Sequence, residues 1–257
     1  MNMLTIITVC KDNVGGLKKT FNSILNQTIH DFNYVVIDGN SSDGSLNLIL
    51  DYEKKFASRG IPFRWVSEID HGIYDAMNKG IMLDDSPYTI FMNSGDLFYG
   101  NDAVKKFYEE VARDKSIVDV YYGKTFCVGS GRKKSFAMPF YIVEQTKKIT
   151  RMPTKHQGFF IKTSLLKQRP YDTSFKIIAD FEWCMYAFYS GKVFKHLDWI
   201  VCSFDMSGIS STNLTEKYRE ATQARKRYNC ADTRIVYCIK LCVWSFFEKT
   251  EICRKFC

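Results

Sequence analysis

Short apolar runs alternate with amphipathic segments through the first 112 residues of the chain. Runs rich in β-branched and aromatic residues are typical of buried strands, and apolar residues spaced three and four apart are typical of helices. The strand-like runs are 4–9, 34–37, 62–66 and 89–92, and the helix-like segments are 15–27, 45–56, 72–82 and 103–112. This alternation predicts an α/β fold with a mostly parallel, Rossmann-like central sheet flanked by helices.

The stretch from Tyr88 to Phe98, YTIFMNSGDLF, ends a buried strand in a turn and a carboxylate. Ligands of open α/β sheets collect beyond the carboxyl ends of the strands, so Asp96 could meet a bound molecule and its counter-ion there. The alternative is that Asp96 only opens the next segment. Neither GxGxxG after the first strand nor GxxxxGK[ST] occurs. We therefore expect phosphate to be handled by a metal ion on carboxylates.

Beyond Asp119 the pattern is less regular. We expect strands over 118–122, 124–128 and 193–204, helices over 177–189 and 214–228, and a basic turn in GSGRKKS at 129–135. The chain opens directly on a strand-like segment without a charged and apolar leader, which predicts a cytosolic protein. Its nine cysteines form no CxxC pair and are interpreted as reduced thiols.

The net charge of +8 is concentrated near the C-terminus. Residues 217–257 hold ten Lys and Arg against four Asp and Glu, which argues against a nucleic-acid surface on the main body. Within this region, 235–247 has 11 apolar residues in 13 and is flanked by basic residues. It is shorter than the roughly 20 residues of a membrane span. Two interpretations stay open: a helix in the membrane interface, or a helix packed on the domain.

Several segments together resemble family 2 glycosyltransferases, the inverting enzymes of GT-A fold that build bacterial polysaccharides. They are TIITVCKDN, VVIDGNSSDGS, SEIDHGIYDAMNKGI, FMNSGDLF, HQGFF, ADFEW and SGISS, in that order along the chain. The resemblance implies a GT-A domain over 1–212, with a donor half at about 1–118 and an acceptor half at about 119–212. The remaining residues, 213–257, would form a basic, aromatic helical extension.

The resemblance implies a nucleotide pocket at the ends of the first two strands. Asp38 matches the position whose carboxylate accepts a hydrogen bond from the base, and it could alternatively stabilise the turn. Thr8 and Cys10 match the backbone of the pocket. Asp43 is interpreted as a loop or helix cap, because Asp-Gly before a helix is common turn chemistry.

The block from Ser67 to Ile81 would line the donor sugar and diphosphate. Its candidate residues are Asp70, Asp75, Asn78 and Lys79, together with Asn93, Ser94 and Gly95 of the next strand end. Asp75 shares a helix face with Asn78 and with Lys79. Lys79 is either a phosphate partner or part of a solvated face.

The metal motif departs from the family pattern. Where many members have Asp-x-Asp-Asp, this chain has Asn93-Ser94-Gly95-Asp96 and keeps only the last carboxylate. Asp96 would be the principal protein ligand of Mn²⁺ or Mg²⁺, with diphosphate and water completing the set. His156 could supply a nitrogen ligand, contact the leaving phosphate or be structural.

Asp180 matches the family's general base, in an acidic motif on a helix. Glu182 would orient the acceptor or cap local structure, and Trp183 would stack on an acceptor sugar or pack in the core. The implied reaction moves a sugar from a nucleotide-diphosphate sugar, such as UDP-glucose, to a lipid-diphosphate-linked saccharide in O-antigen-like polysaccharide synthesis, at the cytoplasmic face of the inner membrane. Alternatives are GDP-fucose or UDP-galactose as donor, or an inactive nucleotide- or carbohydrate-binding scaffold.

Overall fold

The computed structural model describes residues 2–83, 85–128, 136–138, 142–205 and 213–230. Its first part is the predicted alternation of strands and helices. The elements are β1 (Leu4–Cys10), α1 (Val14–Leu25), β2 (Phe32–Asp38), α2 (Ser45–Ser58), β3 (Phe63–Ser67), α3 (Ile73–Met82), β4 (Tyr88–Phe91), β5 (Leu97–Phe98) and α4 (Ala103–Arg113). β3, β2, β1 and β4 are neighbours in that order and all run parallel, which confirms the predicted sheet.

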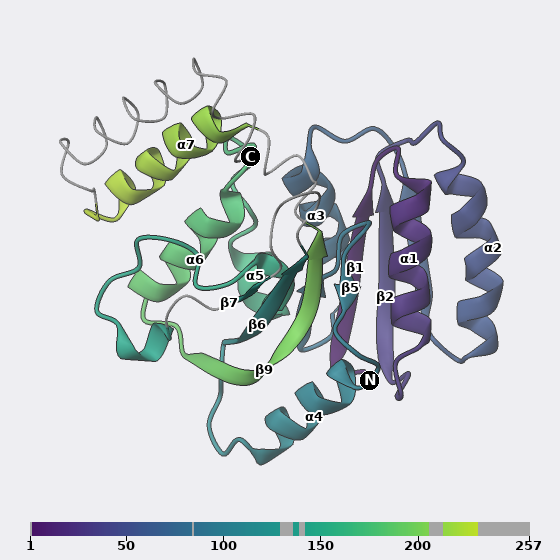
Figure 1. Cartoon of the computed structure of the whole chain (residues 1–257), viewed down its shortest axis with the longest axis horizontal. Coiled ribbons are helices and arrows are strands. Elements are labelled where there is room, and N and C mark those ends of the chain that lie inside the picture. The colour runs from purple at the N-terminus through teal and green to yellow at the C-terminus, as the bar shows by residue number, and fades with distance from the viewer. Residues whose placement is uncertain (1, 84, 129–135, 139–141, 206–212, 231–257) are drawn as a thin grey trace.

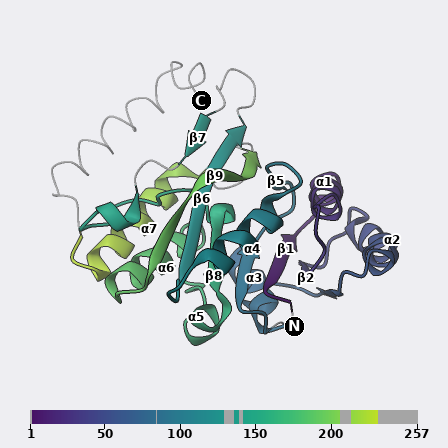
Figure 2. The ribbon, with the colours of Figure 1, turned by 90° about the horizontal axis from the view of Figure 1, so that it is seen from below.

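The second part extends this sheet with strands of both directions. Its elements are β6 (Val120–Val128), β7 (Phe136–Met138), η1 (Val143–Gln145), η2 (His156–Gly158), β8 (Phe159–Lys162), α5 (Thr163–Gln168), α6 (Ala179–Tyr189), β9 (Phe194–Asp205) and α7 (Leu214–Arg227). β8 joins β4 and β6 antiparallel, and β6 and β9 run parallel and side by side (Figure 2). The sheet is therefore mixed beyond β4.

Helices cover both faces of the sheet. Successive side chains of a strand point to opposite faces, so Ile6 packs in a cluster with α1, α2 and α4, whereas Ile7 packs in a second cluster with α3, α5 and α6. Figure 1 shows α1 and α2 together beside the parallel strands, and α6 and α7 beside the mixed part. The two clusters form the core that fixes the strand ends.

β6 corrects one prediction. The sequence suggested two strands, 118–122 and 124–128, separated at Gly123, but β6 continues through this position with a shift of register against β9. A Cβ on Gly123 would lie 2.5 Å from Cγ2 of Val201 and 3.0 Å from the carbonyl oxygen of Trp199. This glycine therefore permits close packing against β9 and does not mark a turn.

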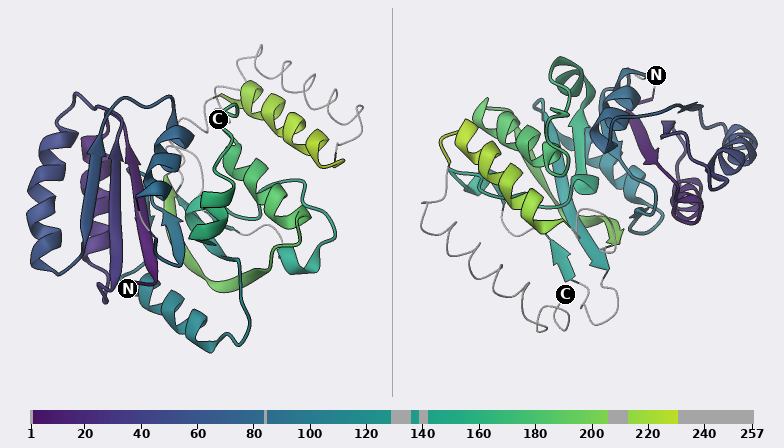
Figure 3. Two further views of the ribbon diagram at one scale, coloured as in Figure 1. Left: turned by 180° about the vertical axis from the view of Figure 1, so that it is seen from behind. Right: turned by 90° about the horizontal axis from the view of Figure 1, so that it is seen from above.

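α7 lies along α6 in both views of Figure 3. The carboxylate of Glu220 on α7 accepts hydrogen bonds from the backbone amides of residues 176–178, at 2.7, 2.9 and 3.2 Å, just before α6 begins. Among the helices in the described part of the chain, none has the length and apolar character needed to cross a bilayer. The predicted turn at 129–135, the SGISS segment at 207–211 and the apolar segment at 235–247 lie outside the described residues.

Candidate active site

The carboxyl ends of β1, β2 and β4 meet at one edge of the sheet. Cys10, the last residue of β1, is paired with Asp38, the last residue of β2. The amide of Ser94, beyond β4, donates to the carbonyl oxygen of Val9 at 3.1 Å. The structure therefore brings together predicted positions that are separated by more than eighty residues in the sequence, as expected where ligands bind to open α/β sheets.

The turn from Asn93 to Asp96 is held against α1. Gly95 has φ of +103°, a conformation that favours glycine. The hydroxyl of Thr20 accepts from the Gly95 amide and donates to the Asp96 carbonyl oxygen, both at 2.9 Å. The Ser94 hydroxyl donates to the carbonyl oxygen of Asn13 at 3.1 Å. These bonds fix the backbone conformation of the turn that carries the Asp96 carboxylate.

Asp38 is fully buried and organises the loop that follows β2. Its carboxylate accepts from the Ser41 amide at 3.0 Å, from the Ser41 hydroxyl and from the Ser67 hydroxyl at 2.6 Å. Asp38 stabilises the turn in this conformation, and its contact with a nucleobase stays a prediction.

Thr8 and Cys10, in the second half of β1, have buried side chains, and their predicted backbone contact with a nucleotide stays a prediction. The Thr8 hydroxyl donates to the Met92 carbonyl oxygen at 2.7 Å. Burial raises the pKa of the Cys10 thiol, which lies 3.6 Å from the Ser45 hydroxyl. Asp43 accepts from the Ser45 amide at 3.0 Å and from the Val14 amide at 2.7 Å, and so joins the starts of α2 and α1 as a cap.

The carboxylate of Asp70 lies directly over Gly39. A Cβ on Gly39 would be 2.4 Å from Oδ2 of Asp70, so only glycine leaves room for this approach. Oδ1 of Asp70 accepts from the Gly72 amide at 3.0 Å. The Lys11 ammonium donates to the carbonyl oxygens of Gly39 and Asn40 from the other strand end. Asp70 thus lies over the carboxyl end of β2.

Lys79 stabilises the loop before α3. Its ammonium lies 2.8 Å from Oε1 of Glu68, 2.9 Å from the Ile69 carbonyl oxygen and 3.5 Å from Oδ2 of Asp75. The hydrogen bond to Glu68 raises the pKa of Lys79, despite opposition from desolvation. Asp75 in turn accepts from the His71 amide at 2.9 Å. Lys79 would have to leave these partners to bind a phosphate.

Asn78 connects the two parts of the domain. Its side-chain amide donates to the Tyr171 carbonyl oxygen and accepts from the Tyr171 amide, both at 2.9 Å. Both ends of the Asn78 amide are therefore engaged inside the protein, and its role in this conformation is to hold the segment before α6 against α3.

Asp180 is the centre of a hydrogen-bond network that joins three predicted motifs. Oδ1 lies 2.9 Å from the Tyr74 hydroxyl on α3, and Oδ2 lies 3.2 Å from Nδ1 of His156 in η2. Nε2 of His156 lies 3.1 Å from the side-chain nitrogen of Asn93, beyond β4. The Asp180 side chain is 16% exposed. The network therefore holds one partly accessible carboxylate in a fixed orientation.

His156 lies between Asp180 and Asn93. Its Nδ1 faces the Asp180 carboxylate, and its Nε2 faces the side-chain amide of Asn93. Both ring nitrogens are engaged, which leaves neither free for a metal ion. His156 therefore joins Asp180 to Asn93 in this conformation, and its roles as a nitrogen ligand or a contact to the leaving phosphate stay predictions.

The same contacts keep Asp180 ionised. Burial opposes the charged form, but the hydrogen bond and charge of His156, with further hydrogen bonds from Tyr74 and the Phe181 amide, hold the pKa of Asp180 below its usual value. A carboxylate with a low pKa carries no proton at neutral pH. Asp180 is therefore an ionised carboxylate held between His156 and Tyr74.

Asp96 is buried beside Gln157, whose side-chain amide donates to Oδ2 of Asp96 at 2.6 Å. The side-chain oxygens of Gln157 and Asn93 are buried without a hydrogen-bond partner. Carboxylate and amide oxygens are the donors that Mn²⁺ and Mg²⁺ accept, so this surrounding fits such an ion. Within the residues that the structure describes, no group of three or more His, Cys, Asp or Glu forms a ready metal site. Substrate oxygens would have to supply most ligands.

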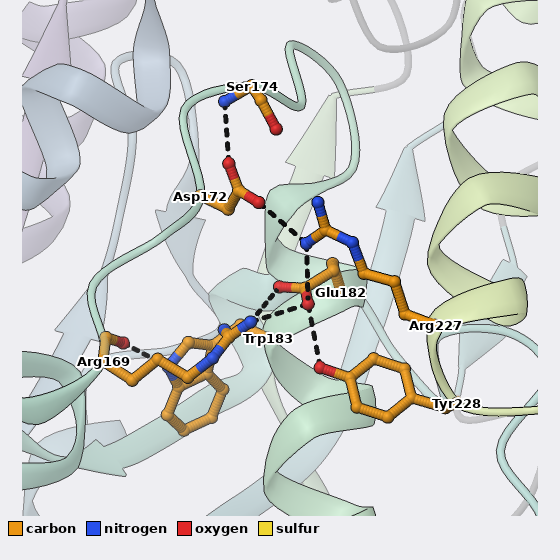
Figure 4. Close-up of polar contacts among 7 residues, drawn as sticks. All are labelled: Arg169, Asp172, Ser174, Glu182, Trp183, Arg227 and Tyr228. Atoms are coloured by element: carbon orange, nitrogen blue, oxygen red, sulfur yellow. Dashed lines mark hydrogen bonds and ion pairs between the residues drawn. The ribbon is translucent and has the colours of Figure 1, made fainter.

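Glu182 and Trp183 lie in the interior. Glu182 is fully buried, with two hydrogen bonds from Arg169 at 2.6 and 2.8 Å and one from the Tyr228 hydroxyl at 2.8 Å (Figure 4). Trp183 is 2% exposed and donates its indole N–H to the Arg169 carbonyl oxygen at 2.8 Å. The burial of both side chains agrees with the alternatives that Trp183 packs in the core and that Glu182 stabilises local structure.

Sequence reasoning did not assign roles to Tyr74 and Gln157. Tyr74 was placed on the predicted helix without a function, although it contacts Asp180 directly. Gln157 follows His156 in the sequence, and the two neighbouring side chains hold Asp180 and Asp96. The available signal for Gln157 was its place in a polar pair with His156 before a buried strand. The sequence does not show which residues this pair contacts, because the partners come from distant parts of the sheet.

The family to which the sequence belongs defines its class, the glycosyltransferases. Residues 5–175 match the model of glycosyl transferase family 2, and the chain belongs to this family. An uncharacterised glycosyltransferase of Mycobacterium tuberculosis strain H37Rv is 29% identical over 211 residues, which cover 81% of this chain and 77% of that protein. A glycosyltransferase of PGL/p-HBAD biosynthesis from Mycobacterium bovis BCG is 24% identical over 219 residues, which cover 84% and 78%.

Solved structures share the GT-A fold. Staphylococcus aureus TarS 1–349 in complex with UDP superposes with a TM-score of 0.66 at 18% identity, covering 87% of this chain and 64% of that one. The mannosyltransferase PcManGT of Pyrobaculum calidifontis, in complex with GDP-Man and Mn²⁺, gives a TM-score of 0.67 at 13% identity, covering 90% and 65%. This chain therefore spans less than two thirds of either structure.

Proposed function

We propose that this protein is an inverting glycosyltransferase that moves a hexose from a UDP-sugar, with UDP-glucose as the first candidate, to a lipid-diphosphate-linked saccharide. The product would belong to a bacterial surface polysaccharide of O-antigen type. The observation that carries the reaction is the Asp180 carboxylate, oriented by His156 and Tyr74 at the ligand edge of the sheet. Family membership supplies the sugar-transfer class.

In this mechanism, Asp180 removes the proton from the acceptor hydroxyl as its oxygen attacks C1 of the donor sugar. The bond from C1 to the diphosphate oxygen breaks, and the nucleoside diphosphate leaves from the opposite face. The new bond forms on the face opposite the leaving group, so the configuration at C1 inverts. His156 and Tyr74 keep Oδ1 and Oδ2 of Asp180 in place throughout.

Asp96 is the proposed protein ligand of a divalent ion, Mn²⁺ or Mg²⁺. When bound, such an ion neutralises charge on the leaving diphosphate. Gln157 orients the carboxylate by its hydrogen bond at 2.6 Å. With one carboxylate on the protein, we expect weak metal binding without donor and stronger binding with it.

The lipid-linked acceptor is proposed from the resemblance and from the basic, apolar C-terminal region of the sequence. The protein would act peripherally at the cytoplasmic face of the inner membrane, where the acceptor is embedded. This part of the proposal is tested with the acceptor itself, since residues 231–257 lie outside the described structure.

The donor is identified by a thermal-shift panel of UDP, GDP, CMP and dTDP, each with Mn²⁺ and with EDTA. A ligand that binds the folded state raises the unfolding midpoint by linkage, with about 2.7 kcal/mol at a hundred times Kd. We expect UDP with Mn²⁺ to give the largest shift. A larger shift with GDP would identify the donor as a GDP-sugar instead of a UDP-sugar. GDP-sugars such as GDP-fucose would then be tested.

The single carboxylate of the metal motif favours one alternative, a non-catalytic nucleotide- or carbohydrate-binding scaffold of the same fold. The two functions differ in turnover. Release of UDP from UDP-glucose, UDP-galactose and other UDP-sugars in the presence of acceptor lipid would establish the transferase. Nucleotide binding without release of UDP from any of these donors would favour the scaffold.

A further inference from the structure

Glu220 is a buried carboxylate to which the proposed reaction gives no role. Its side chain lies on the inner face of α7, and the residue is 2% exposed. Glu216, the other acid of this helix, pairs instead with Arg219 on the same helix. Glu220 also lies beyond residues 5–175, which the family model matches. Because a buried carboxylate needs hydrogen-bond donors, the donors of Glu220 show what this residue holds.

The donors are three successive backbone amides of the segment that leads into α6. Oε1 of the carboxylate accepts from the Lys176 amide at 2.7 Å, and Oε2 accepts from the amides of Ile177 and Ile178 at 2.9 and 3.2 Å. Ile178 is the N-cap residue of α6. Amides at a helix start have no partner inside the helix, and a carboxylate is favourable there. Glu220 therefore fixes the way in which α6 begins.

The same segment is tied to Asp180 through a second route. The carbonyl oxygen of Ile177 lies 2.8 Å from the Tyr74 hydroxyl, which lies 2.9 Å from Oδ1 of Asp180. The Phe181 amide donates to this Oδ1 at 2.9 Å. Ile177 thus contacts Glu220 through its amide and Tyr74 through its carbonyl oxygen. A short stretch of backbone connects the Glu220 carboxylate to the Asp180 carboxylate.

We infer that Glu220 is a positioning residue for Asp180, which it places through the backbone of residues 176–178. This inference rests on the proposed function for the role of Asp180 as the base. Without Glu220, the three amides lose their acceptor, and the segment has to move to find new partners. A displacement of about 1 Å at a reacting group can lower the rate about a hundredfold.

The kinetic test is a double-mutant cycle between Glu220 and Asp180. Glu220→Ala is made in wild type and in Asp180→Asn, and each protein is assayed by UDP release with acceptor and by UDP titration. A residue that acts through Asp180 has no effect once the base is gone, whereas a loss of folding stability acts in both backgrounds. Glu216→Gln is the matched control, because its carboxylate pairs with Arg219. Circular dichroism checks that each variant is folded.

We expect Glu220→Ala to lower kcat about a hundredfold in wild type and to leave it unchanged in Asp180→Asn, with the same UDP affinity throughout. Glu220→Gln keeps one acceptor oxygen and should lose about tenfold. Glu216→Gln should behave like wild type. An equal loss of kcat in both backgrounds would overturn the inference, and so would full activity of Glu220→Ala.

Hydrogen exchange at single amides, followed by NMR, tests the same link without substrate. The amides of residues 176–178 report on Glu220, and the Phe181 amide reports on the Asp180 carboxylate to which it donates. In Glu220→Gln we expect both to exchange about tenfold faster than in wild type, and in Glu216→Gln neither should change. Faster exchange at 176–178 with no change at Phe181 would show that Glu220 holds the segment without positioning Asp180.

The two measurements separate the inference from the proposed function. If wild type releases no UDP from any donor, the transferase proposal is rejected, and the exchange of the Phe181 amide still decides whether Glu220 positions Asp180. If wild type is active and Glu220→Ala has the same kcat, the transferase proposal stands and the role of Glu220 is rejected.

Discussion

The hydroxyl of Tyr74 lies 2.9 Å from Oδ1 of Asp180, although 106 residues separate them in the sequence. The same hydroxyl lies 2.8 Å from the carbonyl oxygen of Ile177, so its single proton is shared between two acceptors. This contact ties α3 to the first turn of α6. The two helices are thereby held together at the Asp180 carboxylate.

Replacing Asp180 with Asn removes the base and keeps the shape of the side chain. We expect transfer to fall by about 10²–10⁴-fold, the usual contribution of a positioned general base, while donor affinity stays close to wild type. The measurement is initial rate of UDP release together with UDP titration. Loss of donor binding with the activity would move Asp180 out of the base role.

Removing His156 should change the pH dependence of the reaction. Burial raises the pKa of Asp180, and His156 supplies the first of the contacts that lower it. His156→Ala therefore raises this pKa, and activity is lost at a higher pH as the solution is acidified. Tyr74→Phe should shift the acidic limb in the same direction but less, because its proton is shared. An acidic limb that stays in place in both variants would contradict this assignment.

Gly39→Ala tests the placement of Asp70. The new Cβ would lie 2.4 Å from Oδ2 of Asp70, a flexible side chain that moves away at little expense to the fold. We expect the free energy of unfolding to change by less than about 1 kcal/mol and donor affinity to fall about tenfold. Gly15→Ala is the control, since its Cβ meets nothing within 4 Å. Donor affinity equal in the two variants would remove Asp70 from the nucleotide site.

Glu182→Gln should destabilise the protein without entering the chemistry. The substitution leaves the Arg169 charge without its buried partner, and such losses typically cost about 3 kcal/mol. Glu109→Gln, at a surface pair with Arg113, should change stability by less than about 0.5 kcal/mol. Chemical denaturation measures both. If Glu182→Gln is folded at low temperature and still has a lower kcat than wild type, Glu182 has a role at the acceptor site and not only in stability.

The fold was largely predictable because the strands of the parallel half are buried on both faces and read as continuous apolar runs. For the candidate site, the sequence identified the residues but not the contacts that their side chains make. The bonds of Asp38 to Ser41 and Ser67 and of Lys79 to Glu68 depend on loop conformations that no local pattern encodes. The partner of Glu182 could not be predicted for another reason: Tyr228 directly follows α7, and contacts so distant in sequence leave no periodic signal.

The bonds from Glu220 to the amides before α6 set a lower limit on a working fragment of this enzyme. A protein cut at residue 212 would retain every motif of the family resemblance, yet it would lose the carboxylate that satisfies these three amides. Asp180 lies two residues after Ile178, whose amide is the last of the three. Fragments designed for crystallisation should therefore extend at least through Tyr228, whose hydroxyl also reaches Glu182.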